Sequence, residues 1–157
     1  MSVTKIKDLT LPILNQGSKT GKKHSGKKVA LISLGCPKNQ VDSEVILGNL
    51  KHSQRVDDAE SADTIIINTC GFIESAKQES IQTILEAIRL KERAAKKGIK
   101  KEIIVAGCLS ERYRDELIAE MPEVDAFFGV QEFAEIAARV EGHYQQIFFT
   151  DRVLLNQ

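Results

Sequence analysis

The sequence predicts an α/β fold in which a mostly parallel, five-stranded sheet is doubly wound, with helices flanking both of its faces. Three short runs of β-branched and aliphatic residues support this prediction: Lys28 to Ser33, Thr64 to Thr69 and Glu102 to Gly107. Continuous apolar runs of this length are typical of parallel strands that are buried on both faces. Segments with helical periodicity separate the runs, and strands that alternate with helices indicate parallel pairing.

Two weaker strands and four helices complete the predicted fold. We expect the strands around Arg55 and Val56 and at Ala126 to Phe128. Each helix is predicted by a stripe of apolar residues at helical spacing. The stripes are Val41, Val45, Ile46 and Leu50; Ile81, Ile84, Leu85 and Ile88; Leu117, Ile118 and Met121; and Phe133, Ile136, Ala137 and Val140.

The sequence also marks the ends of the helices. Ser75 followed by Gln78 matches a capping box for the second helix, and Gly98 is its expected stop. Ser110 is expected to cap the third helix, which Pro122 ends. With these boundaries, the order of elements is that of a flavodoxin-like domain.

One domain is expected to hold all of these elements. The chain has 157 residues, of which 42% are hydrophobic, and this is enough for one core. Residues 1–27 are rich in glycine, serine and lysine and are predicted to form a flexible basic tail. The domain itself is expected at residues 28–150. Residues 151–157 are expected to begin a linker, because no further element is indicated there.

The net charge of zero conceals an uneven distribution. Residues 1–28 contain seven lysines and one acid, whereas the remaining 129 residues contain 15 basic and 21 acidic side chains. An acidic body disfavours binding to a phosphate backbone and favours a basic partner. We therefore do not expect direct binding to nucleic acid.

The sequence patterns exclude several locations. The longest apolar runs are far below the ~20 residues that span a bilayer, so no membrane attachment is expected. The first residues lack the pattern of a secretory signal. Three widely spaced cysteines, an odd number, argue against a disulfide framework and predict a reducing, cytoplasmic location.

Each of the three strong strands leads into a cysteine. Cys36, Cys70 and Cys108 follow these strands in turn. Because the carboxyl ends of parallel strands lie along one edge of a sheet, where ligands bind, we expect the three thiols to converge. In an iron–sulfur site, three cysteines would leave one iron without a protein ligand.

The surroundings of the cysteines suit thiolates. A glycine lies beside each of them, at Gly35, Gly71 and Gly107, and lets backbone amides approach sulfur closely. Each cysteine also precedes a predicted helix, whose N-terminal dipole is expected to lower the pKa of the thiol. Hydrogen bonds from backbone amides to sulfur tune the reduction potential of an iron–sulfur cluster.

Two plainer interpretations stay open at this point. Free cysteine is commonly a small buried hydrophobe, and the chain would then be a non-catalytic, flavodoxin-like binding module. Structural zinc would need a fourth ligand, and His24, His52 and His143 all fall outside the strand-end loops. Nucleotide-binding motifs are missing from the sequence, since neither a Walker loop nor G-x-G-x-x-G follows the first strand.

The three segments that contain the cysteines resemble the signature segments of methylthiotransferase N-terminal domains. They are Ser33 to Glu44 (SLGCPKNQVDSE), Asn68 to Ile73 (NTCGFI) and Ala106 to Tyr113 (AGCLSERY). The resemblance covers residues 28–150, and three such motifs in order are highly specific.

Within this family, two details resemble the RimO type, which modifies an aspartate of a small-subunit ribosomal protein. They are Cys36 to Asn39 (CPKN) and Gly71 to Ala76 (GFIESA). The tRNA-modifying members usually have Gln-Met-Asn after the first cysteine and an Arg-Glu pair after the second, and neither is present here. The N-terminal domain of a tRNA adenosine methylthiotransferase is the alternative within this family, and the missing motifs count against it.

The resemblance implies a cofactor and a larger enzyme. Cys36, Cys70 and Cys108 would hold an auxiliary [4Fe–4S] cluster with one open iron, which supplies or carries the sulfur. A second [4Fe–4S] cluster and S-adenosylmethionine are expected in a radical barrel, and no cysteines remain here for its Cys-x-x-x-Cys-x-x-Cys motif. That barrel and a C-terminal domain are the expected partners, with the ribosomal protein as substrate. This chain alone is expected to be inactive and to hold no catalytic residue.

Residues around the cysteines are candidates for supporting the cluster. They are Gly35, Asn39, Asn68, Thr69, Gly71 and Gly107. Local physics offers a second explanation for two groups of polar residues. Asn39, Asp42, Ser43 and Glu44 also fit helix capping and first-turn charge, and Asn68 and Thr69 also fit turn chemistry at a strand end. Arg112 and Tyr113 are expected to be surface or interdomain residues.

Overall fold

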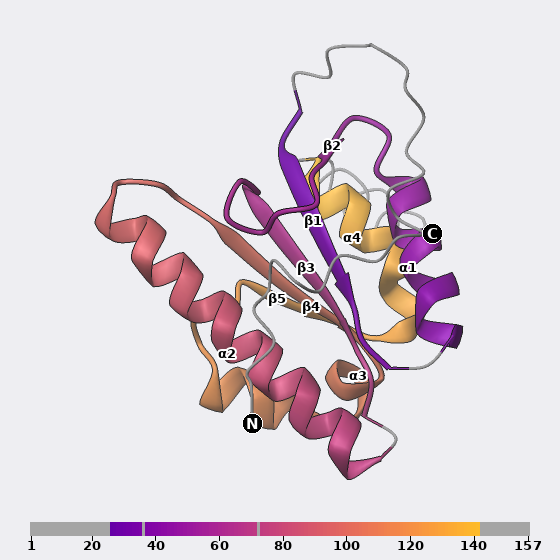
Figure 1. Cartoon of the computed structure of the whole chain (residues 1–157). Helices are drawn as coiled ribbons and strands as arrows, with labels where there is room; N and C mark the ends of the chain where they lie inside the picture. Colours follow the sequence, from indigo (N-terminus) through magenta and orange to yellow (C-terminus); the bar gives the residue numbers. More distant parts are fainter. Residues whose placement is uncertain (1–25, 36, 72, 142–157) are drawn as a thin grey trace, which may run out of the picture.

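Figure 1 shows the computed structural model of the chain, which describes residues 26–35, 37–71 and 73–141. A central sheet lies between two layers of helices. In chain order, the elements are β1 (Lys28–Ser33), α1 (Pro37–Asn49), β2 (Gln54–Arg55), β3 (Thr64–Thr69), α2 (Glu74–Lys96), β4 (Glu102–Gly107), α3 (Cys108–Glu120), β5 (Ala126–Phe128), the 3-10 helix η3 (Val130–Glu132) and α4 (Phe133–Val140).

The sheet has the strand order β2-β1-β3-β4-β5, and every pairing among these strands is parallel. This is the flavodoxin-like order, in which ligands bind where the strand order reverses, between β1 and β3. The predicted doubly wound sheet is therefore confirmed. The register places Ser33 beside Asn68 and Thr69 beside Gly107, so the carboxyl ends of β1, β3 and β4 are level.

The alternation of side chains along β3 divides the core into two halves. Ile65 and Ile67 pack with α2 and α3 on one face of the sheet, whereas Ile66 packs with α1 and α4 on the other. Figure 1 shows these two pairs of helices on opposite sides of the strands. All six residues of β3 are buried, because this strand is central and has helices over both faces.

The strand predictions agree closely with the structure. The stripes predicted for the first and third helices are partly wrong, and on α3 the residue outside the buried face is Ile118. The weak strand β2 ends at Arg55, one residue earlier than expected. On α1, Val41 and Val45 are 59% and 50% exposed. The buried face of α1 instead carries Asn39 and Ser43, followed by Ile46 and Leu47, because its first turns face polar groups at the end of β3.

Two predicted helix caps are also wrong. The residue before α2 is Ile73, and no side chain caps this helix, so Ser75 and Gln78 do not form a capping box. Helix α3 begins at Cys108, so Ser110 lies buried inside its first turn instead of capping it.

The predicted helix stops are confirmed. Gly98 follows the last residues of α2 with a φ of +75°, a conformation that glycine adopts at helix ends. Pro122 follows the end of α3 at Glu120.

The predicted domain boundaries are only partly covered by the structure. Residues 1–25 of the expected tail, residues 142–150 and the expected linker at 151–157 lie outside the described residues. The last two tail residues belong to the fold, because the Gln54 N–H donates a hydrogen bond of 2.9 Å to the Lys27 carbonyl. No helix within the described ranges is long and apolar enough to cross a membrane.

Ile66 provides a test of this core. Ile66→Ala is expected to lower the free energy of unfolding by about 2–5 kcal/mol, because it leaves a cavity in the centre of the sheet. Ile66 is 0% exposed, whereas Ile118 on α3 is 50% exposed. Ile118→Ala is the matched control and should cost less than about 1 kcal/mol. Urea denaturation followed by circular dichroism measures both, and equal losses would contradict the assignment of Ile66 to the core.

Candidate functional site

Two of the three cysteines lie side by side at the carboxyl edge of the sheet. Cys70 directly follows β3, and Cys108 directly follows β4 as the first residue of α3. They are neighbours because the residues before them, Thr69 and Gly107, are partners in the sheet register. Cys70 is buried, Cys108 is half-buried, and both are free thiols. Cys36 lies outside the described residues.

The loop after β1 reaches this same edge and packs on Cys70. Gly35 has a φ of +90°, and a Cβ atom at this position would lie 2.5 Å from the Cβ of Cys70 and 3.0 Å from its Sγ. Only glycine allows this combination of conformation and close approach. Gly35 is the residue before Cys36, so the loop that carries the first cysteine contacts the second.

Two further glycines bring the remaining loops together. A Cβ atom at Gly107, whose φ is +100°, would lie 2.5 Å from the Thr69 carbonyl oxygen and 2.6 Å from the Asn68 Oδ1. A Cβ atom at Gly71 would lie 3.2 Å from the Cα of Leu109, the residue after Cys108. The segments at the ends of β1, β3 and β4 therefore approach one another closely, and the three glycines expected beside the cysteines make this possible.

A buried pair of asparagines ties α1 to the end of β3. The Asn39 Nδ2 donates hydrogen bonds to the Leu34 carbonyl at 2.7 Å and to the Thr69 carbonyl at 2.9 Å. In return, the Asn68 Nδ2 donates to the Asn39 carbonyl and to the Ser43 Oγ, both at 3.0 Å. A capping side chain would accept from helix N–H groups, so the interpretation of Asn39 as a cap is wrong. Asn39 and Asn68 position the strand-end loops.

Thr69 and Ser80 fix the second cysteine from two further directions. The Thr69 Oγ1 donates a hydrogen bond of 2.6 Å to the Ala106 carbonyl and so links β3 to β4. The Ser80 Oγ accepts from the Cys70 N–H at 3.2 Å and donates to the Cys70 carbonyl at 3.0 Å. All of these side chains are buried, so their hydrogen bonds are shielded from water.

Sequence reasoning missed Ser80, although the pattern held a signal for it. Ser80 lies between Ala76 and Ile84 at four-residue spacing on the buried face of α2. A polar residue inside an apolar stripe needs a hydrogen-bonding partner, because burying it without one is costly. The Cys70 backbone supplies that partner.

Burial controls the electrostatics of Cys108. It raises the pKa of the thiol above its ordinary value, Lys38 lowers it, and Cys70, Glu111 and Asp42 raise it further. The expected lowering of the pKa by the helix N-terminus is therefore wrong for Cys108, because loss of solvent outweighs the favourable charges around it. The neutral thiol is the form at neutral pH in the protein without a bound cation.

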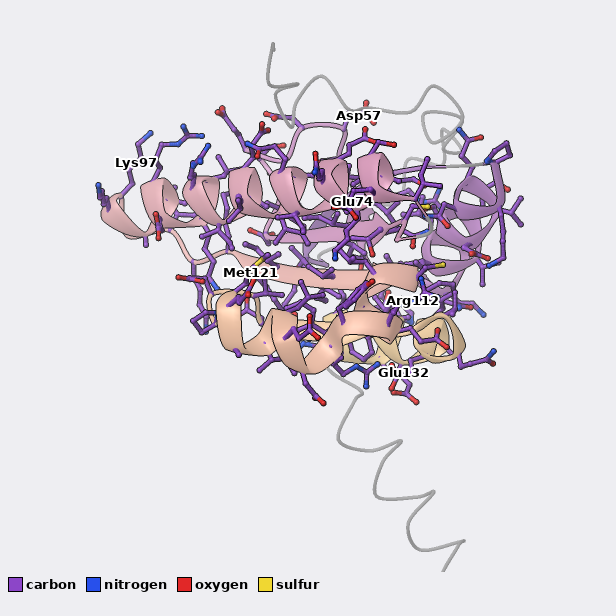
Figure 2. The ribbon with its side chains drawn as sticks, turned by 90° about the horizontal axis from the view of Figure 1, so that it is seen from below. Asp57, Glu74, Lys97, Arg112, Met121 and Glu132 are labelled. Atoms are coloured by element: carbon purple, nitrogen blue, oxygen red, sulfur yellow. The ribbon has the colours of Figure 1, made fainter. Side chains whose placement is uncertain are left out.

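A surface pocket of about 420 Å³ lies beside Cys108. Its lining is formed by Lys38, Gly71, Cys108, Glu111, Arg112 and Val130. Figure 2 shows Arg112 at one end of the sheet and Lys97 at the opposite end of the molecule. The expectation of a surface position for Arg112 holds, and the structure adds that this residue faces the cysteine edge together with Lys38.

The first turn of α3 is separated from the rest of the helix by a kink. Tyr113 has a φ of −124° and a ψ of 26°, outside the helical range. Its ring packs under the Lys77 ammonium, whose Nζ lies 4.2 Å from the ring centroid. Tyr113 thus anchors the turn from Cys108 to Arg112 against α2, so its surface assignment is incomplete: it joins two helices.

Within the described ranges, no three His, Cys, Asp or Glu side chains form a group that could hold a metal ion. Cys36 lies outside these ranges. His52 is exposed, and its backbone N–H donates to the Glu141 Oε1 at 2.8 Å, while His24 and His143 lie outside the described residues. The described donors at the carboxyl edge are thus the thiols of Cys70 and Cys108, and thiolates are ligands for soft metal ions and iron–sulfur clusters.

Comparison with known proteins identifies the fold unit just described. A family described as "Uncharacterized protein family UPF0004" matches residues 28–129, which include all three cysteines. The chain belongs to this family. The UPF0004 match ends close to the last strand and contains every loop of the cysteine edge.

Similar proteins assign the chain to one branch of the methylthiotransferases. The ribosomal protein uS12 methylthiotransferase RimO of Chloroherpeton thalassium is 54% identical over 82% of this chain and 29% of its own length. Proteins of the same name from Acetivibrio thermocellus and Helicobacter pylori are 55% and 52% identical, over 76% and 83% of this chain and 26% and 28% of theirs. The chain is thus a RimO-type N-terminal domain, and it spans less than a third of these relatives.

One solved structure shows a weak likeness to this chain. A structure described as adenylate cyclase from Rhodopirellula baltica aligns over 84% of this chain and 99% of its own, with a TM-score of 0.40 and 8% identity. A likeness at this level carries no argument about the activity of the UPF0004 domain.

Gly107 tests the close packing of the loops. Gly107→Ala is expected to destabilise the domain by about 1–3 kcal/mol, because the new Cβ atom overlaps the Thr69 carbonyl and the backbone is in the left-handed region. Gly48→Ala on α1 is the matched control, because a Cβ atom there meets nothing within 4 Å. It should be neutral or stabilising by up to about 1 kcal/mol. Thermal unfolding measures both variants, and a neutral Gly107→Ala would contradict the geometry.

Cys108 provides a pH-dependent test. Because its pKa is raised, less thiolate is present at neutral pH than in a free cysteine, and iodoacetamide should label Cys108 more slowly than a free cysteine between about pH 7 and 9. Lys38→Met removes a nearby positive charge and should slow labelling further at every pH in this range. Lys97→Met, remote from the site, is the control. Peptide mass spectrometry gives the rate for Cys108 alone, and faster labelling in Lys38→Met would contradict this account.

Proposed function

We propose that this chain binds an auxiliary [4Fe–4S] cluster through Cys36, Cys70 and Cys108, as part of a methylthiotransferase that modifies an aspartate of a small-subunit ribosomal protein. The observation that carries the proposal is the juxtaposition of Cys70 and Cys108 at the level ends of β3 and β4, with the Gly35 loop packed on Cys70. The two thiols lie at the edge where ligands bind in this type of sheet.

The donor set suits iron better than zinc. Structural zinc takes four protein ligands, and the described part of this edge offers two thiols and no histidine. The sequence has one further cysteine, Cys36, two residues after Leu34, whose carbonyl is held by Asn39. A [4Fe–4S] cluster can be held by three cysteines, with one iron left without a protein ligand. A structural zinc site, in contrast, would lack its fourth protein ligand.

The protein around the thiols supplies rigidity and a dry environment. The asparagine pair, Thr69 and Ser80 hold the backbone of the strand ends on both sides of Cys70. Cys70 is only 7% exposed, so the interior ligand is shielded from water and oxidants. Cys108, which is half-buried and next to the pocket, lies on the accessible side of the site.

The bound cluster would supply sulfur for transfer, at the iron that the protein does not ligate. The residues of this chain prepare that position. Because a coordinating thiol must be deprotonated, Cys108 would hold the cluster as a thiolate and would release its proton to solvent. Lys38 already favours the thiolate of Cys108.

The substrate and the remaining machinery are proposed from the relatives. Proteins named ribosomal protein uS12 methylthiotransferase are similar over most of this chain but are more than three times its matched length. We assign the radical S-adenosylmethionine chemistry and a second cluster to the part of such proteins that this chain does not contain. The acidic body of the domain, with 15 basic and 21 acidic side chains after residue 28, suits a basic ribosomal protein better than tRNA.

Anaerobic reconstitution with iron and sulfide tests the cluster proposal. The wild-type chain should bind about four iron atoms and show the Mössbauer spectrum of a [4Fe–4S] cluster. Cys36→Ala, Cys70→Ala and Cys108→Ala should each bind markedly less iron, because each removes one ligand. Ile118→Ala, on the exposed face of α3, is the matched control and should bind as the wild type does.

The result also separates the competing functions. A colourless protein that binds one zinc ion, or iron binding that survives all three substitutions, would refute the cluster assignment. If the chain binds no metal and the three Cys→Ala variants differ only in stability, the domain is a binding module whose cysteines belong to the core.

A further inference from the structure

The pocket beside Cys108 is lined by two cationic side chains from different helices. Lys38 lies in the first turn of α1, and Arg112 lies in the first turn of α3. The two residues are 74 positions apart in the sequence, and the level strand ends bring them to the same cavity. The N-termini of two helices therefore point to this region, and their dipoles add to its positive potential.

Two acidic side chains near the pocket each have a partner. The Glu111 Oε2 accepts a hydrogen bond of 2.8 Å from the Val130 N–H, so this carboxylate is tied to η3. The Asp42 Oδ2 forms an ion pair with the Lys38 Nζ at 3.7 Å, one turn along α1. This distance is longer than a hydrogen bond, and the Lys38 side chain is 67% exposed, so its ammonium can still donate to a ligand.

Arg112 is also available. It forms no ion pair within the described part of the chain and is exposed at the surface. Arg114, two residues later, shows the contrast, because it is engaged in an ion pair with Glu132. A guanidinium group presents a planar fork of donors that matches a carboxylate in a bidentate arrangement.

We propose that Lys38 and Arg112 bind the carboxylate of an acidic side chain in this pocket, and so hold the aspartate to be modified next to Cys108. This inference rests on the proposed function, since it assigns residues to the recognition of its substrate. The volume of about 420 Å³ is within the range of small-molecule sites and accommodates one aspartate side chain. Recognition by charge selects aspartate over the isosteric asparagine.

A single carboxylate fits these observations better than a nucleic-acid phosphate chain. The pocket lining contains Glu111 beside the two cations, and residues 29–157 carry 21 acidic and 15 basic side chains. A polyanion would be repelled by this surface, whereas one carboxylate needs only the two local donors.

A binding experiment tests the pair without requiring turnover. The ¹⁵N-labelled chain is titrated with N-acetyl-aspartate methylamide and, separately, with N-acetyl-asparagine methylamide, while the amide signals of Lys38, Gly71, Arg112 and Val130 are followed by NMR. We expect saturable shifts with the aspartate compound and at least about tenfold weaker binding of the asparagine compound, the difference that one charge-assisted contact supports.

Matched variants assign the effect to the pair. The double variant Lys38→Met with Arg112→Gln should bind the aspartate compound no better than the asparagine compound. Lys38→Arg should retain the preference, and Lys97→Met should behave as the wild type does. Equal binding of both compounds to the wild type, or binding of inorganic phosphate at least about tenfold tighter than of the aspartate compound, would overturn the proposal.

Iron reconstitution separates this inference from the proposed function. The single variant Arg112→Gln retains Lys38 and all three cysteines, and should bind as much iron as the wild type. If the wild type binds iron but does not distinguish aspartate from asparagine, the carboxylate site is wrong and the cluster proposal stands. If no cluster forms in any variant, the cluster proposal fails, whatever the pocket binds.

Discussion

The candidate site depends on the two hydrogen bonds that the Asn39 carboxamide donates. This group donates to the carbonyl of Leu34, after β1, and to the carbonyl of Thr69, at the end of β3, so one side chain joins the two strands between which the order of the sheet reverses. Asn68 completes the link by donating back to the Asn39 carbonyl and to Ser43 on α1. These groups are buried, and leaving any of the carbonyls without its donor would cost about 1–3 kcal/mol. The network therefore specifies one arrangement of the cysteine loops.

Glycine provides the second constraint, because it removes the side chains that would keep the loops apart. Gly35 lies against Cys70, and Gly107 lies against Thr69 and Asn68, both with positive φ values that other residues rarely adopt. Hydrogen bonds and missing Cβ atoms thus act on the same backbone segments. The result is a rigid edge at which thiols, amide groups and a small pocket meet, while the two apolar layers below it supply most of the stability.

Burial and nearby charges determine the chemical properties of this rigid edge. Burial holds Cys108 in its neutral form, and Lys38 partly offsets this effect. The same lysine also lines the pocket with Arg112, so one cation serves both the thiol and the cavity beside it. Lys38, Arg112 and the starts of two helices bring positive charge to this point of a domain with a net excess of acidic side chains, and the nearby Glu111 is bonded to the backbone of Val130.

The sequence by itself determined the strands, their parallel order and the edge to which the cysteines belong, because continuous apolar runs and strand-end glycines express local requirements that need no partner to be recognised. It also indicated the residues around the site, including Asn39, Asn68 and Thr69, without deciding what they do. Only the tertiary structure decided that Asn39 spans two strand ends, that α1 buries Asn39 and Ser43 in place of Val41 and Val45, that Ser80 holds Cys70, and that Lys38 and Arg112 share a pocket. These arrangements bring together different segments of the chain, for example Ser80 and Cys70, ten residues apart, and Lys38 and Arg112, 74 residues apart. Periodicity along a chain records which face of an element is apolar, but not which polar group from another element will meet it.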